Sequence, residues 1–314
     1  MSLSPIHVAA AVIRNADGRV LLTKRAQHSH QGGLWEFPGG KLEPGESLGQ
    51  GLRREIKEEL GLELLAHRPL LRNLHHYPDR SVLLDVHLVT EYRGVAAGLE
   101  NQPLQWVEPE RLAEYPMPEA DLPVVRAITL PDRYLITGPD PMQQQQFLER
   151  LQQALDSGIG MVQLRPGAMP EQAILELGRE ALQLCHSRGV RMLLNGTPEM
   201  ALAIGAAGVH LNGKRLLALT ERPLPDDYLV AASCHTDAEL AHASVLGLDF
   251  AVLSPVRETG SHPGAALLGW ERFGVMVAGA NLPVYALGGM QQGDLGTAWE
   301  HGAQGIAGIS CFWG

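Results

Sequence analysis

The stretch that decides the N-terminal fold spans residues 40–62 and reads GKLEPGESLGQGLRREIKEELGL. Within it, Leu52, Ile56 and Leu60 recur at four-residue spacing, which is the spacing of one face of a helix. A glycine-rich loop precedes this stripe, and a glycine that can cap a helix follows it. The pattern predicts a loop and then a helix over 48–60 whose apolar stripe faces a core.

The same helix carries three carboxylates, Glu55, Glu58 and Glu59, at positions i, i+3 and i+4. Residues at that spacing share one helix face, where each like-charged pair is destabilising by about 0.2–0.5 kcal/mol. A solvated acidic surface is one explanation of such a face. The alternative is a site for a cation that offsets the repulsion.

Two features of the preceding loop favour the cation site. Gly40 lets a backbone carbonyl approach an ion, and Glu46 is placed to pair with Arg54 and to lock the loop to the helix. Hard oxygen ligands of this kind suit Mg²⁺ or Mn²⁺, which keep bound waters and bridge phosphate groups. We therefore expect a divalent-metal site that cleaves a diphosphate linkage by activating or positioning water.

Short apolar segments surround this helix. They predict strands at 8–13, 20–23, 81–89 and 104–107, and a second helix at 122–128. The run Asn15-Ala16-Asp17-Gly18 is a turn sequence of the hairpin type, which predicts that the first two strands pair. A proline-containing segment ends the pattern, so the first domain is expected over residues 1–130.

A different pattern begins at Arg133, where short apolar strands alternate with helical segments. The expected strands are 134–137, 161–165, 192–195, 208–211, 229–233, 250–254, 284–287 and 305–310. Repeated strand-then-helix units of this number predict a (β/α)₈ barrel of the TIM type over residues 133–314. The fold class expected for the chain is α/β, with two domains.

Composition and charge exclude several functions. The formal net charge of −10 argues against duplex nucleic acid as a partner, because phosphate binding requires clustered cations. Three widely spaced cysteines, Cys185, Cys234 and Cys311, match no zinc pattern and are expected to be buried free thiols. The sequence shows neither a secretory leader pattern nor an apolar run long enough for a membrane, so we expect a cytoplasmic protein without a membrane partner.

Residues 40–62 fit the Nudix box, G-x5-E-x7-R-E-U-x-E-E-x-G-U, at every specified position. The resemblance extends over residues 6–128 and is closest to the MutT-like branch, the 8-oxo-dGTP diphosphatases of nucleotide-pool sanitation and DNA repair. It implies an α/β/α sandwich with a mixed sheet. It also implies Mg²⁺-dependent hydrolysis of a nucleoside triphosphate, such as 8-oxo-dGTP or dGTP, to the monophosphate and pyrophosphate. The catalytic residues that it implies are Arg54, Glu55, Glu58, Glu59 and Glu100, with Gly40 and the four glutamates as metal ligands.

The resemblance also assigns substrate contacts. The runs LTKR, WEFPGG and YPDR, which contain Arg25, Phe37 and Arg80, are similar to the MutT segments before the box and at the nucleotide pocket. By this analogy Arg25 contacts phosphate, Phe37 and Arg80 line the nucleotide pocket, and Glu100 assists the metal or the water. The alternatives are an exposed Arg25, a core Phe37 and a surface Glu100.

One position departs from the MutT pattern. Where that branch offers an asparagine to the base, this chain has Asp121. An amide both donates and accepts hydrogen bonds, whereas an ionised carboxylate only accepts them. Asp121 is therefore compatible with the N1 and N2 donors of a guanine, but it does not predict a strict preference for 8-oxoguanine.

The second half resembles the thiamine-phosphate synthase and TenI family over nearly its whole length. The similar runs are QLR at 163–165, GVHL at 208–211, SPV at 254–256, ALGG at 286–289 and IS at 309–310. Gly288, Gly289 and Ser310 follow the last two strands, where barrels often bind phosphate through backbone N–H groups. We expect a phosphorylated ligand at these residues.

The metal ligands of the synthase are not matched. Its Asn-Asp-Arg after the third strand reads Asn195-Gly196-Thr197, and its aspartate after the fourth strand is replaced within 212–215. The loss of both carboxylates predicts a barrel without synthase activity.

His235 resembles the TenI side, where a histidine at this place is the acid–base group of a metal-free thiazole tautomerase. A structural histidine or a vestigial pocket is the alternative.

Three functions are therefore open for the chain. The first is a nucleotide pyrophosphohydrolase with an accessory barrel. The second is a bifunctional enzyme whose barrel acts in thiamine metabolism. The third is a hydrolase regulated by a barrel that senses a phosphate-bearing ligand without catalysis.

Overall fold

The computed structural model describes residues 4–27, 29–138, 143–259, 264 and 266–313. The chain divides into two compact units, Met1–Leu130 and Pro131–Gly314. Among the described residues, no helix is both long enough and apolar enough to span a membrane.

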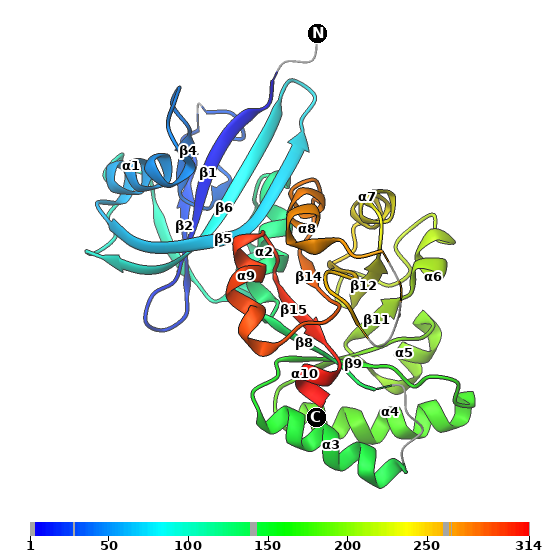
Figure 1. Cartoon of the computed structure of the whole chain (residues 1–314). Helices are drawn as coiled ribbons and strands as arrows, with labels where there is room; N and C mark the ends of the chain where they lie inside the picture. Colours follow the sequence, from blue (N-terminus) through cyan, green and yellow to red (C-terminus); the bar gives the residue numbers. More distant parts are fainter. Residues whose placement is uncertain (1–3, 28, 139–142, 260–263, 265, 314) are drawn as a thin grey trace. The chain divides into compact units, whose positions relative to one another are not determined.

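The first unit contains two small sheets (Figure 1). A mixed sheet has the order β4 (Gly39–Lys41), β1 (Ile6–Ile13), β6 (Ser81–Arg93) and β5 (Glu63–His76). β1 and β6 are parallel, and the other neighbours are antiparallel. An antiparallel sheet has the order β3 (Trp35–Glu36), β2 (Val20–Lys24) and β7 (Leu104–Val107). Short 3₁₀ helices span Pro109–Glu114 and Glu119–Asp121.

Two helices cover opposite faces of the mixed sheet. Helix α1 (Leu48–Leu60) shares a core with Ala11 of β1, and helix α2 (Leu122–Thr129) shares another core with Val12 of the same strand. Successive side chains of a strand point to opposite faces of its sheet, so β1 supplies both cores. The unit is the α/β/α sandwich with a mixed sheet that the sequence predicts.

Two features of the strands differ from the sequence-based expectations. The turn at 15–18 joins β1 to β2, but their pairing ends at a bridge between Arg14 and Val20. β4 and β6 occupy both edges of β1, so the predicted hairpin is wrong beyond that bridge. No expected segment corresponds to β5, because Pro69 and several charged residues interrupt its alternation. A proline is tolerated there because β5 is an edge strand.

The second unit is a closed barrel of parallel strands in sequence order, as predicted. The strands are β8 (Arg133–Ile136), β9 (Met161–Leu164), β10 (Arg191–Leu194), β11 (Gly208–Leu211), β12 (Leu229–Cys234), β13 (Phe250–Leu253), β14 (Val284–Ala286) and β15 (Gly305–Gly308). The helices are α3 (Gln144–Asp156), α4 (Glu171–His186), α5 (Pro198–Ile204), α6 (Gly213–Leu217), α7 (Asp237–Val245), α8 (Gly269–Ala278), α9 (Leu295–Glu300) and α10 (Ser310–Trp313), with a 3₁₀ turn at Gln292–Asp294.

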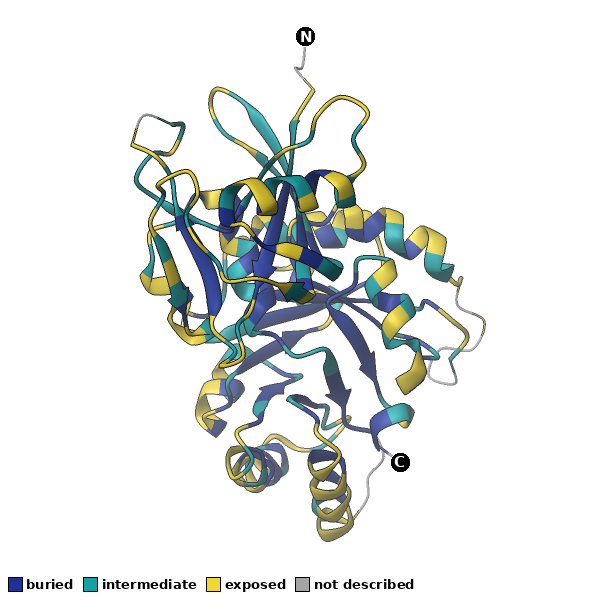
Figure 2. Cartoon of the chain, turned by 90° about the vertical axis from the view of Figure 1, so that its left-hand side faces the viewer, coloured by how far each residue is buried: buried dark blue, intermediate teal, exposed yellow. Residues whose placement is uncertain are grey.

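Aromatic side chains fill part of the barrel interior. Tyr134, Phe250 and Tyr285 are fully buried, and their ring centroids lie 5.2–5.7 Å apart. Figure 2 shows the strands in the buried colour and the helices with one buried and one exposed side. Cys185 and Cys234 are buried free thiols as expected, whereas Cys311 is only partly buried.

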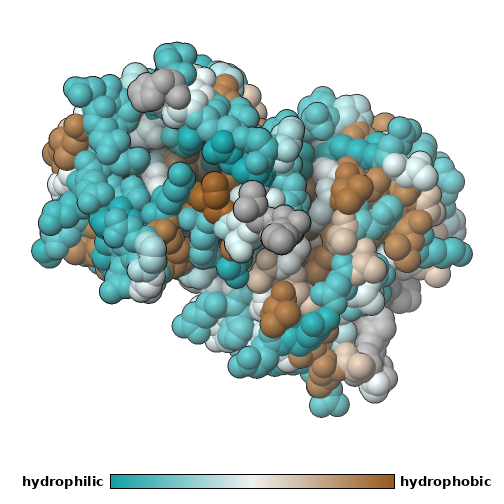
Figure 3. Space-filling model, turned by 90° about the horizontal axis from the view of Figure 1, so that it is seen from above, coloured by the Kyte–Doolittle hydropathy of each residue, from teal (hydrophilic) through white to brown (hydrophobic). Residues whose placement is uncertain are grey.

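The exposed apolar side chains are dispersed over the surface. Val95, Leu217 and Val245, which are more than half exposed, come from separate segments. On the face shown in Figure 3, apolar side chains lie in small groups among hydrophilic ones. Scattered exposed residues of this kind are normal for a folded domain.

A histidine pair joins β5 and β6 in the first unit. His87 on β6 is 7% exposed, and its Nδ1 lies 2.8 Å from Nδ1 of His67 on β5. Burial, against the attraction of Asp85, lowers the pKa of His87 to about 4. The folded state therefore holds this ring in its neutral form.

This shift predicts that acid weakens the first unit. Because the pKa of His87 is lower in the folded state, the unfolded state binds more protons between about pH 6.5 and about pH 4. Stability is then lost as the pH falls through this window, by on the order of 1–2 kcal/mol at pH 5. Hydrogen-exchange protection factors of β5 and β6 at pH 7 and pH 5 measure the loss. His87→Gln is expected to remove most of it, and His76→Gln, at an exposed position, to retain it. An unchanged loss in the His87→Gln chain would contradict this assignment.

Candidate functional site

A cavity of about 460 Å³ opens in the first unit beside β1, β4 and β6. It is lined by many of the residues that the sequence analysis selects, namely Arg25, Phe37, Gly40, Glu59, Arg80, Glu100 and Asp121. They come from six separate segments of the chain, and the fold brings them to one place. Glu55, Glu58 and Arg54 stand on α1 next to this cavity rather than in its wall.

Local signals fix the position of α1. Ser47 and Gln50 form a capping box at its start, and Gly61 ends it in the left-handed region, at φ 69°. The apolar stripe predicted from the sequence is fully buried. The helix is thereby held so that its acidic face lies toward the loop at 39–41.

Arg54 joins this loop to the helix. Its guanidinium donates to both carboxylate oxygens of Glu46, at 2.9 and 2.8 Å, and to the Lys41 carbonyl at 3.2 Å. It also donates to Glu55 at 2.8 Å and to Glu58 at 3.3 Å. The hydrogen bonds from Arg54 lower the pKa of Glu46 to about 2. The predicted pairing of Glu46 with Arg54 is present in the structure.

Glu59 has a different environment. Its carboxylate accepts a hydrogen bond from the Gly39 N–H at 3.1 Å, and it receives none from Arg54. Burial raises its pKa to about 8, and the charges of Glu36, Glu55 and Glu100 act in the same direction. Burial and the neighbouring carboxylates therefore both oppose the ionisation of Glu59.

Two observations fit a divalent cation at this place. A Cβ added to Gly40 would overlap the carboxylate of Glu55, so bare backbone and carboxylate share a narrow space. The raised pKa of Glu59 shows that burial and neighbouring carboxylates oppose its ionisation, which a bound cation would favour. As they stand, no three acidic, histidine or cysteine side chains of the described residues are close enough together to enclose an ion. Arg54 instead forms hydrogen bonds with two of the predicted metal ligands, Glu55 and Glu58.

Arg25 is paired inside the first unit. Its Nη1 forms an ion pair with Glu36, and its Nε donates to the His30 carbonyl at 2.8 Å. Burial raises the pKa of Glu36, and the charge of Arg25 opposes this shift. The alternative of an exposed Arg25 is therefore wrong, and a phosphate would have to compete with Glu36 for this guanidinium. Glu36 lines the cavity and was not among the predicted residues.

The nucleotide side of the cavity has both buried and exposed walls. Phe37 is 2% exposed and belongs to the core on the α2 side, although it also lines the cavity. Arg80 lies at the surface, where it pairs with Asp79 at 2.7 Å. Tyr77 packs edge-to-face against His30, with 5.2 Å between ring centroids, and it lines the same cavity. The position of Tyr77 within the run YPDR was the available signal for it.

Asp121 lies in the buried wall of the cavity and is 6% exposed. Its carboxyl accepts a hydrogen bond from the backbone of Phe37. Burial raises its pKa to about 8, with the charge of Glu36 acting in the same direction and that of Arg25 opposing it. A protonated carboxyl donates as well as accepts, so this residue can present the two functions of an amide.

Glu100 is exposed on the loop before β7, which agrees with the alternative of a surface glutamate. It nevertheless lines the cavity. Gln102 connects this loop to α1. Its side-chain oxygen accepts from the Glu100 N–H at 3.0 Å, and its nitrogen donates to the Glu59 carbonyl at 3.1 Å. Gln102 thus links the backbone at two predicted metal ligands, and it was not among the predicted site residues.

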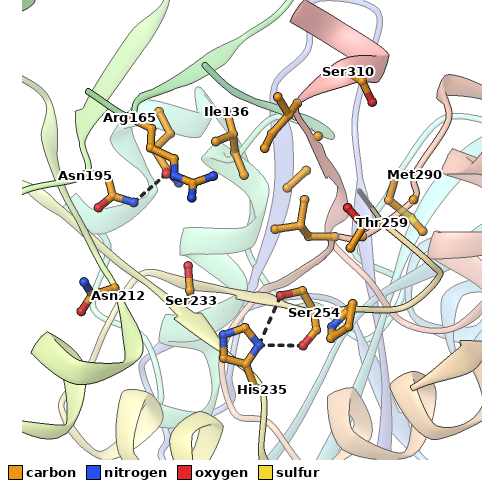
Figure 4. A pocket seen from close by; sticks show the side chains of 18 of the residues that line it. Ile136, Arg165, Asn195, Asn212, Ser233, His235, Ser254, Thr259, Met290 and Ser310 are labelled. Carbon is orange, nitrogen blue, oxygen red and sulfur yellow. Dashed lines mark hydrogen bonds between the residues drawn. The ribbon is translucent and has the colours of Figure 1, made fainter. Parts of the chain in front are cut away.

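The second unit has a cavity of about 580 Å³ at the carboxyl ends of all eight strands (Figure 4). It is lined by the predicted Gly288, Gly289, Ser310 and His235, and also by Arg165, which the sequence analysis did not select. This end of a barrel is where catalytic and ligand-binding residues collect. Among the described lining residues, none carries a carboxylate.

The backbone at the glycine pair is closely packed. Gly288 and Gly289 have φ values of 101° and 64°, which favour glycine. A Cβ on Gly288 would crowd Pro255, and one on Gly289 would overlap the Glu258 carbonyl. Ser310 is exposed at the start of α10. The glycines therefore allow the β14 loop to lie directly against the β13 loop.

His235 is exposed at the rim, and its Nδ1 lies 2.8 Å from the Ser254 carbonyl (Figure 4). A carbonyl only accepts, so Nδ1 carries the proton and Nε2 is left as an acceptor.

Asn195 and Asn212 occupy the strand ends where the synthase pattern has acidic neighbours. The first donates to Gln163 at 2.9 Å, and the second caps α6 by accepting from the Arg215 N–H.

Comparisons with known proteins agree with this division. A NUDIX domain model matches residues 9–127, and a thiamine monophosphate synthase model matches residues 133–312. The chain is 40% identical over 122 residues to the CTP pyrophosphohydrolase of Escherichia coli K12, which covers 39% of this chain and 90% of the relative. The chain belongs to the Nudix family and, through its barrel, to the thiamine monophosphate synthase family. It is a Nudix hydrolase.

Two further likenesses concern one unit each. This Nudix hydrolase is 42% identical over 93 residues to the 8-oxo-dGTP diphosphatase of Proteus vulgaris, covering 30% of this chain and 83% of that one. The solved thiamine phosphate pyrophosphorylase of Pyrococcus furiosus matches 58% of this chain and 87% of its own, with 25% identity and a TM-score of 0.50.

The contact between Gly40 and Glu55 gives a test of the site in this Nudix hydrolase. Gly40→Ala places a methyl group where the Glu55 carboxylate lies, so the carboxylate has to move. We expect kcat for nucleotide hydrolysis to fall about a hundredfold, the cost of a small misplacement of a catalytic group. Gly296→Ala, where an added Cβ meets nothing, is the matched control and is expected to retain wild-type kcat. Full activity in a folded Gly40→Ala chain would argue against a role for this carboxylate.

Proposed function

We propose that the first unit hydrolyses a nucleoside triphosphate to the monophosphate and pyrophosphate, with Mg²⁺ as the physiological metal and Mn²⁺ as a substitute. The observation that carries this proposal is the meeting of Gly40, Glu59 and Glu100 in the wall of one cavity, with the Glu55 carboxylate directly against Gly40. A protein of net charge −10 that acts on polyphosphate needs cations at the site.

The residues of the chain have separate tasks in this proposal. The carbonyl of Gly40 and the carboxylates of Glu55, Glu58, Glu59 and Glu100 would hold the metal. When bound, Mg²⁺ neutralises phosphate charge and lowers the pKa of water. Arg54 keeps the loop and the helix in register, so that the groups of the chain are in place before substrate binds.

The base side of the cavity supports more than one substrate. Names of the relatives include a CTP pyrophosphohydrolase and an 8-oxo-dGTP diphosphatase. Asp121 is the buried polar group available to a base, with a pKa of about 8. In its protonated form it donates to a ring nitrogen or carbonyl, and in its ionised form it accepts from an amino group. We infer that the unit accepts both oxidised purine and cytosine nucleotides.

The hydrolase proposal is tested with a panel of nucleoside triphosphates at pH 7.5, with and without Mg²⁺. We expect pyrophosphate release that depends on the metal, and we expect Glu58→Gln to lower kcat/KM at least about tenfold. Glu63→Gln, at an exposed carboxylate outside the cavity, is the control and keeps wild-type rates. If Glu58→Gln hydrolyses the best substrate as fast as the wild type, the metal assignment is wrong.

Asp121→Asn tests the base contact. The amide donates and accepts at every pH, as in the MutT pattern, so we expect 8-oxo-dGTP to gain over CTP in kcat/KM by about five- to tenfold. The ratio of the two kcat/KM values at pH 6.5 and pH 8.5 is the measurement. In the wild type this ratio changes with pH as Asp121 ionises, whereas in Asp121→Asn it is constant. A wild-type ratio that is independent of pH, with no change in the variant, would remove Asp121 from base recognition.

A second function is favoured for the barrel by the absence of carboxylates among its described lining residues. Synthase chemistry on a pyrophosphate would need a metal site, and we infer that this barrel lacks that activity. Arg165 and the backbone at Gly288 and Gly289 instead favour a phosphate-bearing ligand bound without metal. Two roles fit such a ligand: tautomerisation with His235 as the acid–base group, or sensing without catalysis.

A further inference from the structure

A chain of hydrogen bonds runs behind one wall of the barrel cavity. Asn195 Nδ2 donates to Gln163 Oε1 at 2.9 Å, and Gln163 Nε2 donates to the Tyr134 hydroxyl at 3.4 Å. That hydroxyl lies 3.2 Å from Nδ1 of His210, and His210 Nε2 lies 2.9 Å from Oγ of Ser233. Asn195, Gln163 and Ser233 line the cavity, whereas Tyr134 and His210 do not.

The middle of the chain is sealed from solvent. Tyr134 and His210 are fully buried, and Gln163 is 2% exposed. Burial, with the charge of Arg165 acting in the same direction, lowers the pKa of His210 to about 3. His210 is therefore neutral and carries one ring proton, which is either on Nδ1 or on Nε2.

The donors of the chain decide between these two positions. Because Gln163 donates to the Tyr134 oxygen, the tyrosine hydrogen is directed to its other neighbour, Nδ1 of His210. Nδ1 then accepts, so the ring proton must be on Nε2, where it is donated to Ser233. The hydroxyl hydrogen of Ser233 has no acceptor among the described residues and is available to the cavity.

We propose that Tyr134 and His210 are positioning residues that hold Ser233 as a hydrogen-bond donor toward the barrel cavity. They touch no ligand themselves. Tyr134 places the ring proton of His210 on Nε2, and this proton occupies one acceptor lone pair of the serine oxygen. The hydroxyl hydrogen of the serine is thereby left for a ligand. This inference rests on the proposed metal-free ligand of the barrel. It adds that one wall of the barrel cavity presents hydrogen-bond donors to that ligand.

The polarity has a consequence for the chemical class of ligand. Arg165, which lines the same cavity, is also a donor only. The wall formed by Arg165 and Ser233 therefore selects groups rich in acceptors, such as a phosphate or a carboxylate. A ligand that presents an N–H to Ser233 can use only the one remaining lone pair of Oγ and leaves the hydroxyl hydrogen without an acceptor, which is unfavourable in a buried site.

The tautomer of His210 tests the chain directly. The ¹⁵N shifts of the histidine rings distinguish a protonated Nε2 from a protonated Nδ1, and the signal of His210 is identified by its loss in His210→Gln. In the full-length wild type we expect the Nε2–H form, and in Tyr134→Phe a mixture of the two tautomers. An Nδ1–H form in the wild type would overturn the proposal, because the serine would then be directed to donate inward.

The effect on binding is measured with inorganic phosphate. Met290 lines the barrel cavity, and no methionine lines the nucleotide cavity among the described residues, so a ¹³C-methyl label on methionine reports phosphate at the barrel alone. Ser233→Ala is expected to raise the Kd for phosphate about tenfold, since a donor to a charged group is lost. Tyr134→Phe is expected to raise it about threefold without removing any group from the cavity.

A matched pair of variants separates positioning from packing. His210→Gln places an amide N–H near the site of Nε2–H and is expected to retain phosphate affinity within about twofold, whereas His210→Leu is expected to behave like Ser233→Ala. Equal affinity in wild type, Ser233→Ala and Tyr134→Phe would overturn the proposal. No response of Met290 in the wild type would overturn the anion-binding proposal for the barrel, while the tautomer of His210 would still decide the polarity of the chain.

Discussion

The catalytic unit depends on the guanidinium of Arg54. Three carboxylates on one helix face repel one another, and the loop before the helix carries a fourth. Arg54 is within hydrogen-bond distance of Glu46, Glu55 and Glu58 and of the loop backbone, so one cation offsets much of this repulsion and fixes the loop relative to the helix. Glu59, which Arg54 does not reach, is the carboxylate whose pKa rises to about 8. Burial and neighbouring carboxylates oppose the ionisation of Glu59, so a bound cation would be stabilising there.

The cavities of the two units differ in the charged groups that line them. The cavity of the first unit is lined by carboxylates and keeps Arg25 in an ion pair with Glu36, so under the proposed function polyphosphate would bind there together with recruited cations. Among its described lining residues, the barrel cavity has Arg165 and glycine backbone but no carboxylate. A ligand with a phosphate group can bind the second cavity through groups that the protein already supplies. This difference follows from side-chain chemistry and not from the shape of either cavity.

Sequence patterns predict much of the architecture because they report local physics. The stripe of Leu52, Ile56 and Leu60 is enough to define α1, since its spacing, cap and loop all agree. The alternation of strands and helices defines the barrel in the same way. The sequence pattern does not predict β5, because Pro69 interrupts the alternation of apolar and polar residues. The proline is tolerated only because β5 lies at a sheet edge. The hairpin from β1 to β2 fails for a related reason: the local turn is correct, but β1 already has partners on both edges.

The sequence by itself determined the family, the acidic helix face and the partner of Arg54, because all of these are encoded within one contiguous stretch. Tertiary structure alone decided which charges are compensated. Glu36 pairs with Arg25, Gln102 connects Glu100 to Glu59, and burial raises the pKa of Asp121 to about 8. The direction of the hydrogen bonds that end at Ser233 is also a tertiary property, because it depends on four strands meeting in the barrel interior. Burial and long-range pairing set the ionisation and orientation of polar groups, and neither can be read from the spacing of residues along the chain.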